Sequence, residues 1–345
     1  MAGLRTEVLS GIQSKSVPWL WQPYLPISML AMLTGDPSAG KAWFSLAVSA
    51  DVTKGRIPVT GEPAAPCAVL YLSAENSPEY VVRPRFDLLG GDATRFHVAR
   101  DAVTLSDSGA LSAALDRTEA RLLIVDPVQS FLGAKVDMHR SNSTRPVLDG
   151  LARIAEDHNC CVLLIRHMTK GTGGKGMYRG LGSIDLTGAV RSELLVGLSP
   201  DDASQRAMVQ VKSNLDDVGP ALGYTVAGGK FAWTGESDLT ESDLLTSKST
   251  GSGRSALDRA VQFLVEQLAE GKERTSTEID IAAKDKGISA ATLRRAREKA
   301  GVGHRQNAEK HSILYLVKGR SVAQDTRVEQ LTENEQLSKD ARDER

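Results

Sequence analysis

The sequence predicts an α/β protein with a mostly parallel sheet covered by helices on both faces, followed by a small helical unit. The main observation is an alternation of short apolar runs with segments of helical periodicity between residues 29 and 233. Strands that are apolar along their whole length need cover on both faces, which is the environment of a parallel sheet. A second observation is the run of closely spaced strand-like segments after residue 190, which is typical of antiparallel strands added to one sheet edge.

The expected elements of this α/β part follow from the alternation. Apolar runs predict strands at residues 29–34, 67–73, 95–99, 121–126 and 161–166. The helical segments between them are expected at residues 41–54, 78–89, 108–118 and 146–158. The later strands are expected at residues 192–198, 207–212, 222–226 and 230–233.

Changes in composition divide the chain into an N-terminal segment (1–28), an α/β domain (29–234), a linker (235–253), a compact unit (254–318) and a charged tail (319–345). The linker is rich in Ser, Thr, Gly and Asp and has no periodicity. The compact unit is expected to contain helices at 256–270 and 276–286, a third helix that Ser289 caps and Gly301 ends, and a strand at 312–317. The tail has no aromatic residue to bury and is expected to be disordered or, at most, to form a lone helix.

The overall composition is that of an ordinary globular protein. Of 345 residues, 41% are hydrophobic and 25% charged, and the net charge is −1, so contacts with nucleic acid would depend on local basic patches. Cys67, Cys160 and Cys161 lie in or directly beside predicted strands without metal-ligand spacing, which is typical of reduced thiols in a cytoplasmic protein. No secretory signal and no membrane-length apolar stretch is present, so no membrane association is expected.

A glycine-containing loop lies between a predicted strand and a predicted helix, with the sequence Gly-Asp-Pro-Ser-Ala-Gly-Lys-Ala at residues 35–42. Its glycines let backbone N–H groups surround a phosphate, Lys41 supplies a cation for the β- and γ-phosphates, and the helix N-terminus adds its dipole. This Walker A pattern predicts binding of ATP with Mg²⁺. The residues expected to contact the nucleotide are Gly35, Asp36, Pro37, Ser38, Ala39, Gly40, Lys41, Ala42 and Trp43.

One position of this loop departs from the pattern. The motif has Ser or Thr after the lysine because that hydroxyl coordinates Mg²⁺, and the methyl group of Ala42 cannot do so. Ser45 lies one helical turn further on, too far for direct replacement, and Ser38 lies in the loop but not at the metal-ligand position. The sequence therefore predicts nucleotide binding and leaves hydrolysis by this chain open.

Three later strands are expected to deliver polar residues to the same edge of the sheet. Glu75 follows the strand after the loop, which we expect to neighbour the loop strand, and it is placed to orient and deprotonate an attacking water. Asp126 ends an apolar strand, as in a Walker B motif, and is the expected Mg²⁺ ligand, with Glu75 as a second acidic candidate. His167 is placed to respond to the γ-phosphate. The alternatives, a surface glutamate and a structural histidine, remain open.

These motifs together resemble the RecA-like P-loop ATPases, and specifically the RepA-like hexameric replicative helicases and AAA family ATPases of plasmids and phages. The resemblance spans about residues 19–233 and is carried by residues 35–41, 72–75, 124–127, 166–171, 178–191 and 211–214. It implies that Glu75 is the catalytic glutamate, that His167 is the γ-phosphate sensor, and that neighbouring subunits of a ring share each ATP site.

The resemblance also implies residues that act across the ring. In DnaB-type helicases a Lys-x-Arg pair reaches into the neighbouring site; here Lys212 matches, and Asn214 replaces the arginine. Arg191 and Arg206 are the candidates for the missing arginine. The expected catalytic set is therefore Glu75, Lys41, Asp126, His167, Lys212 and Arg191.

Two basic, glycine-containing loops, residues 133–145 and 168–183, are expected to face the ring channel and to bind single-stranded DNA through its phosphates. Their candidate contacts are Lys135, Arg140, Arg145, Lys170, Lys175 and Arg179. The unit 254–318 resembles a winged-helix or helix-turn-helix module whose third helix would contact duplex DNA through Arg294, Arg295 and Arg297. Solvated loops and a protein-docking module are the respective alternatives.

Two hypotheses of different classes follow. The first is an ATP-driven translocase on single-stranded DNA, a hexameric replicative helicase with a primase or an initiator as partner. The second is a nucleotide-dependent DNA-binding regulator of replication that hydrolyses little ATP, which Ala42 favours. A recombinase is a third, weaker alternative, because the fold alone does not separate it from a helicase.

Overall fold

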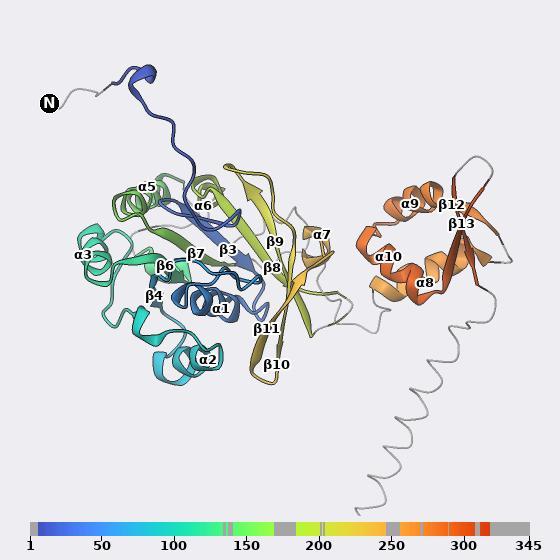
Figure 1. Cartoon of the computed structure of the whole chain (residues 1–345), viewed down its shortest axis with the longest axis horizontal. Helices are drawn as coiled ribbons and strands as arrows, with labels where there is room; N and C mark the ends of the chain where they lie inside the picture. Colours follow the sequence, from blue (N-terminus) through green and yellow to red (C-terminus); the bar gives the residue numbers. More distant parts are fainter. Residues whose placement is uncertain are drawn as a thin grey trace, which may run out of the picture. The chain divides into compact units, whose positions relative to one another are not determined.

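The larger part of the chain is an α/β domain, as Figure 1 shows. The structure is a computed structural model that describes residues 6–133, 136, 141–168, 184–200, 202, 204–245, 256–269, 272–288, 290–307 and 311–317. The chain divides into two compact units, Met1–Thr246 and Ser247–Arg345. Each unit is considered by itself below.

The first unit is organised around a nine-stranded sheet in the order β11-β10-β9-β8-β3-β7-β6-β4-β5. The strands from β8 to β5 in this order are parallel, and β9, β10 and β11 add to β8 in antiparallel fashion. Their bounds are β3 Leu30–Gly35, β4 Ala68–Ser73, β5 Phe96–Val98, β6 Ala120–Asp126, β7 Cys161–His167, β8 Ser192–Leu198, β9 Gln205–Ser213, β10 Leu222–Ala227 and β11 Lys230–Glu236. The predicted fold class is thus confirmed, including the antiparallel extension at one edge.

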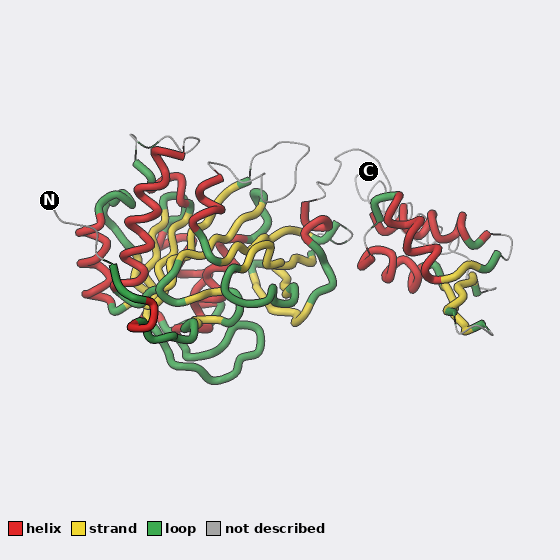
Figure 2. Tube along the Cα trace, turned by 90° about the horizontal axis from the view of Figure 1, so that it is seen from above, coloured by secondary structure: helices red, strands yellow, loops and turns green. Residues whose placement is uncertain are grey.

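Helices cover both faces of this sheet, and successive residues of each central strand alternate between the two resulting cores. In β3, for example, Ala31 and Leu33 pack into one core and Leu30 and Met32 into the other. The helices, seen as red tubes in Figure 2, are α1 Lys41–Thr53, α2 Arg83–Leu88, α3 Ser108–Thr118, α4 Val128–Phe131, α5 Ser141–Asp157, α6 Ile184–Ala189 and α7 Glu241–Leu245. Residues of α1 and α2 enter the first core, and residues of α3, α5 and α6 the second. In the part of the chain that the structure describes, no helix is long and apolar enough to span a bilayer.

The order of the strands corrects one expectation. We expected the strand before Glu75 to neighbour the loop strand, but β7 and β6 lie between β3 and β4. The neighbours of β3 are β7 and β8. Adjacency along the chain does not fix adjacency in a parallel sheet, because each crossover helix can carry the chain past several strands.

The expected N-terminal segment 1–28 belongs in part to the domain core. Strands β1 (Trp19–Trp21) and β2 (Leu25–Pro26) pair in antiparallel fashion. Trp21 is buried, and its ring lies 6.3 Å from that of Phe44 in α1 and 6.0 Å from that of Trp233 in β11, centroid to centroid. Burial of this aromatic cluster fixes the hairpin to the sheet, so the boundary expected at residue 28 does not separate two bodies.

The expected linker 235–253 also begins inside the domain. Its first residues complete β11, and α7 packs on β8, where Leu244 is buried beside Gly197. The carboxylate of Asp243 accepts hydrogen bonds from the N–H and hydroxyl of Thr240, which caps this short helix. A polar composition was therefore a poor guide here, because two leucines suffice to dock one helical turn. Residues 246–255 lie outside the described part of the chain.

Two helices differ from their expected bounds. Helix α5 starts at Ser141, five residues before Pro146, so residues 141–145 of the expected channel loop are helical. Proline is tolerated near a helix start because the first N–H groups have no intrahelical acceptor, and Pro146 removes only one further bond. The helix expected at residues 78–89 is a π-helical turn, Pro78–Val82, followed by α2, with Pro84 at the start of α2.

Among its described residues, the second unit contains three helices and a small sheet. The helices are α8 Ala256–Gln267, α9 Ser276–Asp285 and α10 Ala290–Lys299, and the strands are β12 Arg274–Thr275, β13 Val302–Gln306 and β14 Ser312–Leu316. The sheet order is β12-β14-β13, and both pairs are antiparallel. Thr275 and Glu278 form a capping box on α9, and Gly301 has a φ of 66° just beyond α10, as the sequence predicted for the end of this helix. Ser289 and the tail 318–345 lie outside the described residues.

Candidate nucleotide-binding site

The phosphate loop connects β3 to α1 at the carboxyl edge of the parallel strands. Gly40, with a φ of 91°, is the N-cap of α1, and no side chain caps the helix. The left-handed conformation favours glycine at this position. Because no capping side chain occupies the start of α1, the N–H groups of its first turn are available to an anion.

Lys41 is the first residue of α1 and is buried, with 7% of its surface exposed. Its Nζ donates hydrogen bonds to the carbonyls of Gly35 (2.8 Å) and Asp36 (3.0 Å), so the ammonium lies across the loop. Burial lowers the pKa of Lys41, and the nearby carboxylates of Asp126, Asp36 and Glu75 oppose that shift. A buried cation that donates to two loop carbonyls is a favourable site for phosphate oxygens.

The two unusual residues of the loop are seen directly. Ser38 has a φ of 69°, in the left-handed region that favours glycine, so a side chain here is held with some strain. Ala42 follows Lys41 in the first turn of α1, and its side chain has no oxygen. Ser45 does not take its place, because the Ser45 hydroxyl is buried and donates to the carbonyl of Ala42 at 3.1 Å.

Asp126 ends β6 and is 4% exposed. One of its carboxylate oxygens, Oδ2, accepts hydrogen bonds from the hydroxyl of Tyr71 (2.5 Å) and from the side-chain amide of Asn76 (3.2 Å). Burial raises the pKa of Asp126, and the hydrogen bond from Tyr71 opposes the shift. Two donors on one oxygen fix the carboxylate plane, which orients the other oxygen, Oδ1.

Glu75 and His167 come from different strands and meet at this edge. Glu75 follows β4, His167 ends β7, and their atoms Oε1 and Nε2 are 3.5 Å apart. The carboxylate of Glu75 is about half exposed, at 54%, whereas His167 Nε2 is buried without a hydrogen-bond partner in the described structure. An exposed carboxylate beside a buried ring nitrogen suits a pair that would engage water and a bound phosphate.

The oxygen donors test the fit of Mg²⁺ to this edge. Carboxylates are the ligands that this hard cation prefers, and Asp126, held by Tyr71 and Asn76, provides an oriented one. Position 42 provides a methyl group instead of the usual hydroxyl. The donor set therefore fits Mg²⁺ through its carboxylates and lacks one ligand.

The expected trans-acting residues lie away from this cluster. Lys212 in β9 pairs in register with Glu193, near the amino end of β8, and its Nζ donates to the carbonyls of Thr187 (2.6 Å) and Val190 (2.8 Å). Arg191 precedes β8 at the same end, and its side chain is exposed. Arg206 lies instead beside its own loop, because a Cβ on Gly40 would meet its side chain at 3.4 Å.

Of the expected DNA contacts, only some are described. Lys135, Arg140, Lys170, Lys175 and Arg179 lie outside the described residues. Arg145 is in α5 and pairs with Asp149 at 2.9 Å on the exposed surface.

In the second unit, the arginines of α10 differ in their contacts with neighbouring side chains. Leu293 and Ala296 are buried. Arg294 is exposed, Arg295 Nη2 lies 3.4 Å from the hydroxyl of Thr292, and Arg297 forms a 2.6 Å ion pair with Asp280 of α9. Arg297 is therefore held by a carboxylate of the neighbouring helix.

Sequence reasoning missed the residues that hold the site in place. Tyr71 and Asn76 orient Asp126, and Tyr224 of β10 donates its hydroxyl to the carbonyl of Ala39 in the loop at 2.9 Å. Tyr224 is fully buried, which raises the pKa of its hydroxyl and keeps it a donor. The partners are 50 or more positions apart in each case, and only the register of the sheet brings them together.

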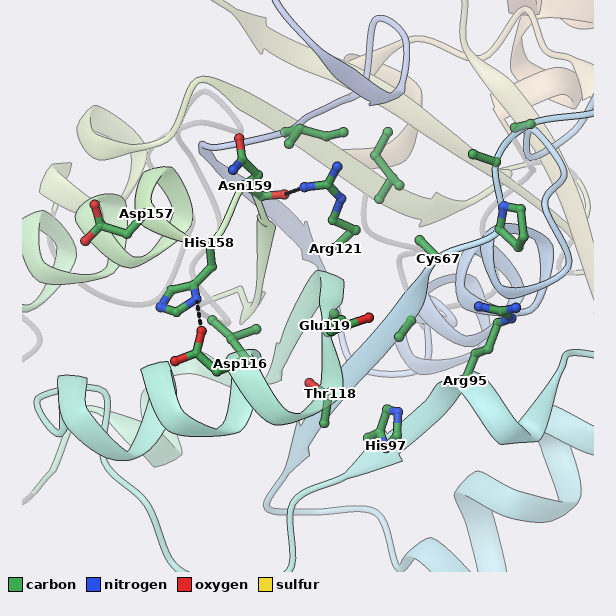
Figure 3. A pocket seen from close by; sticks show the side chains of 18 of the residues that line it. Cys67, Arg95, His97, Asp116, Thr118, Glu119, Arg121, Asp157, His158 and Asn159 are labelled. Atoms are coloured by element: carbon green, nitrogen blue, oxygen red, sulfur yellow. Dashed lines mark hydrogen bonds and ion pairs between the residues drawn. The ribbon is translucent and has the colours of Figure 1, made fainter.

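A cavity of about 880 Å³ lies elsewhere, where the parallel strands begin. Figure 3 shows that acidic and basic residues both line it. His158 Nδ1 lies 3.1 Å from Asp116 Oδ1, and Arg121 donates to the carbonyl of Asn159 at 3.2 Å. None of the residues predicted from motifs lines it. The cavity is separate from the phosphate loop, because the loop lies at the opposite, carboxyl edge of the parallel strands.

The fold and this edge define a P-loop nucleotide-binding domain with a RecA-like core. In agreement, a family model described as an AAA domain matches residues 6–173, a span that includes Lys41, Glu75, Asp126 and His167. The similarity to AAA-type ATPases is thus established for that segment and for nothing beyond it. No curated protein matches the chain.

Proposed function

We propose that this chain is a nucleotide-driven motor ATPase that acts on single-stranded DNA as a hexameric replicative helicase. The observation that supports it best is the meeting, at one sheet edge, of Lys41 on the phosphate loop, Asp126 at the end of β6, and Glu75 paired with His167. The ends of four separate strands, β3, β4, β6 and β7, supply these groups, which is the arrangement that phosphoryl transfer from ATP to water requires.

In this proposal each group has a defined step. Lys41 and the first-turn N–H groups of α1 bind the β- and γ-phosphates and stabilise the charge that develops on them. Glu75 accepts a proton from the water that attacks the γ-phosphorus, so ATP and water give ADP and phosphate. His167 contacts Glu75 and holds its carboxylate near that phosphate. When bound, Mg²⁺ neutralises phosphate charge, and Asp126 would hold it.

The ring is a further part of the proposal. Lys212 and Arg191 lie at the sheet end away from their own phosphate loop, as residues that serve a neighbouring site should. To reach a neighbour, Lys212 has to release the carbonyls of Thr187 and Val190. Mixing a Lys41→Ala subunit with a Lys212→Ala subunit, both carrying Ala42→Ser, should restore some activity. A strictly monomeric species in the presence of ATP and Mg²⁺ would count against the ring.

The second unit supports a separate contact with duplex DNA. Its order of helix, strand, helix, helix, strand, strand is that of a winged-helix module, and Arg294 and Arg295 lie on the helix that would enter the major groove. A primase or an initiator in the cytoplasm is the class of protein partner that this role implies. A docking module for such a partner is the alternative use of the same surface.

A second candidate function, a nucleotide-dependent regulator that hydrolyses little ATP, has its own support. Ala42 removes a metal ligand, and Ser38 holds a side chain in a left-handed conformation within the loop. The missing hydroxyl at position 42 affects turnover more than it affects the contacts of Lys41 with phosphate, so a protein of this kind would bind ATP and hydrolyse it slowly.

The test is ATPase activity, with and without single-stranded DNA, on this chain, on Ala42→Ser and on Ser38→Gly/Ala42→Ser. The helicase proposal expects low turnover in the chain as it stands and DNA-stimulated turnover, on the order of 1 s⁻¹ or more, once the hydroxyl is restored. No stimulation in either variant, with ATP binding intact, would favour the regulator. Turnover of several per second in the unchanged chain would show that the argument about the missing metal ligand is wrong.

A further inference from the structure

A large aromatic side chain, Trp43, lies directly beside the phosphate loop. It is the third residue of α1, two positions after Lys41, and so belongs to the turn whose N–H groups face a bound phosphate. The next residue, Phe44, is buried, and its ring packs against those of Trp21 and Trp233. Trp43 is instead partly exposed and takes part in none of the hydrophobic cores that the described residues form. Core packing therefore does not account for a tryptophan at this position.

The ring of Trp43 has a cation over it. The guanidinium carbon of Arg85, in α2, lies 5.0 Å from the centroid of the ring. Arg83 of the same helix is instead paired with Asp87, with Nε 2.8 Å from Oδ1. Arg85 is partly exposed and forms no ion pair with any residue that the structure describes. The two helices thus present a planar cation over an aromatic ring, and both groups are of the kind that stacks on nucleobases.

The chemistry of a nucleoside triphosphate brings its base to this pair. Only the ribose separates the phosphates from the base, so a nucleotide whose phosphates lie at the first turn of α1 has its base within reach of that turn. Of the first three side chains of α1, Lys41 is directed to the carbonyls of the loop and Ala42 has only a methyl group. Trp43 is the one of the three that offers an aromatic face to a base.

We propose that the Trp43–Arg85 pair is the base subsite of the nucleotide site, on which the purine of ATP stacks. This inference rests on the proposed function, which places the phosphates on Lys41 and the first turn of α1. Stacking supplies affinity through the faces of the base and does not read its hydrogen-bonding edge. The pair therefore selects the size of the ring system, and the two fused rings of a purine should bind more tightly than the single ring of a pyrimidine.

The test compares ATP with inorganic tripolyphosphate, which carries the phosphates without ribose and base, by calorimetric titration of the full chain in the presence of Mg²⁺. A stacked base should make the parent bind ATP about 5- to 150-fold more tightly than tripolyphosphate. In Trp43→Leu this ratio should fall about fivefold or more, while the affinity for tripolyphosphate stays within about twofold of the parent. A Trp43→Leu chain that keeps the parental ratio, or a parent without a preference for ATP, overturns the inference.

Matched variants separate stacking from damage to the helices and from loss of charge. Trp43→Phe keeps an aromatic face and should keep most of the ratio. Arg85→Leu should lower the ratio, whereas Arg83→Leu, on the same helix but paired with Asp87, should not. Trp19→Leu, which removes a partly exposed tryptophan from the lining of the cavity at the opposite edge of the sheet, should also leave it unchanged. Equal effects of Arg83→Leu and Arg85→Leu would overturn the part of Arg85.

Tryptophan fluorescence gives a readout that a purely structural role would not move. ATP should quench the emission of the parent, tripolyphosphate should not, and Trp43→Phe should lose the ATP signal while it still binds ATP. ATP and GTP should bind more tightly than CTP, and equal affinity for CTP would contradict selection by stacking. Binding of ATP and tripolyphosphate without a fluorescence change on ATP overturns the base subsite alone. A parent that binds neither ligand instead refutes the proposed function.

Discussion

Replacing Arg166 alone should destabilise the first unit far more than replacing it together with Glu193. Arg166→Met leaves the Glu193 carboxylate, which is 1% exposed and lies 2.6 Å from the guanidinium, without its cation, and this costs about 3–5 kcal/mol. Glu193→Leu leaves the buried guanidinium of Arg166 without its anion, at the same cost of about 3–5 kcal/mol. The double replacement removes both charges and leaves the hydroxyls of Thr34 and Thr187 without partners, at about 1–3 kcal/mol each. Removal of the desolvated pair offsets this by about 1–4 kcal/mol. The double variant should therefore be destabilised less than the sum of the two single changes, by at least about 1 kcal/mol.

Urea unfolding followed by tryptophan fluorescence measures these differences for the first unit selectively. All four tryptophans of the chain, Trp19, Trp21, Trp43 and Trp233, lie in Met1–Thr246, so the signal reports this unit even in the full-length protein. The linear dependence of the unfolding free energy on urea gives the four values of the double-mutant cycle. Effects of the two single changes that add within about 0.5 kcal/mol would refute the conclusion that the charges are buried as a pair.

Three further predictions rest on other parts of the structure. Trp21→Ala should destabilise the first unit by about 3–5 kcal/mol in the same unfolding assay, because its buried ring anchors the N-terminal hairpin; a loss below 1 kcal/mol would contradict that role. Burial raises the pKa of the thiols of Cys67 to about 11 and of Cys160 to about 12, and that of Cys161 well above its usual value. At pH 8 only about one in a thousand Cys67 thiols, and fewer of the others, is ionised, so a disulfide reagent should modify none of the three until urea unfolds the protein. Deleting residues from 254 onward should spare binding of single-stranded DNA and weaken binding of duplex DNA in a mobility-shift assay, and loss of single-strand binding would make the second unit the main DNA contact.

The strands that carry the site were predictable because each combines two signals. An apolar run long enough to cross the sheet ends in a polar residue, as at Asp126 and His167, and parallel strands deliver such residues to one edge. The 3.5 Å approach of Glu75 to His167 follows from this rule, even though the strand order placed β4 two strands further from β3 than expected. The rule depends on the common edge and not on which strands are neighbours.

Contacts that depend on register were not predictable. Arg166, at the end of an apolar strand, has the composition of an exposed strand end, yet it is buried because Glu193 lies across β3 from it. Similarly, Tyr71 fits an ordinary core position, and its hydroxyl finds Asp126 only because β4 and β6 pair in register. A single sequence fixes the period of each strand but not which residues of distant strands face each other.

Short elements with weak patterns were also missed. Strand β13, Val302–Gln306, is mostly polar, and its place in the sheet depends on pairing with the apolar β14. Helix α7 has five residues in a segment that otherwise has the composition of a linker. Tertiary packing decides such elements, because one or two buried side chains outweigh the local preference of the chain.

The role of the phosphate loop as the nucleotide site is tested by calorimetric titration of ATP, in the presence of Mg²⁺, into this chain and into Lys41→Ala and Lys54→Ala. Lys41 is the buried cation of the phosphate loop, whereas Lys54 is an exposed lysine at the other end of the same helix. A P-loop site predicts that the parent and Lys54→Ala bind ATP alike and that Lys41→Ala shows no measurable binding, because the phosphates lose their main cation. Equal affinity in Lys41→Ala and the parent would contradict the assignment of this loop as the nucleotide site, and with it the proposed motor.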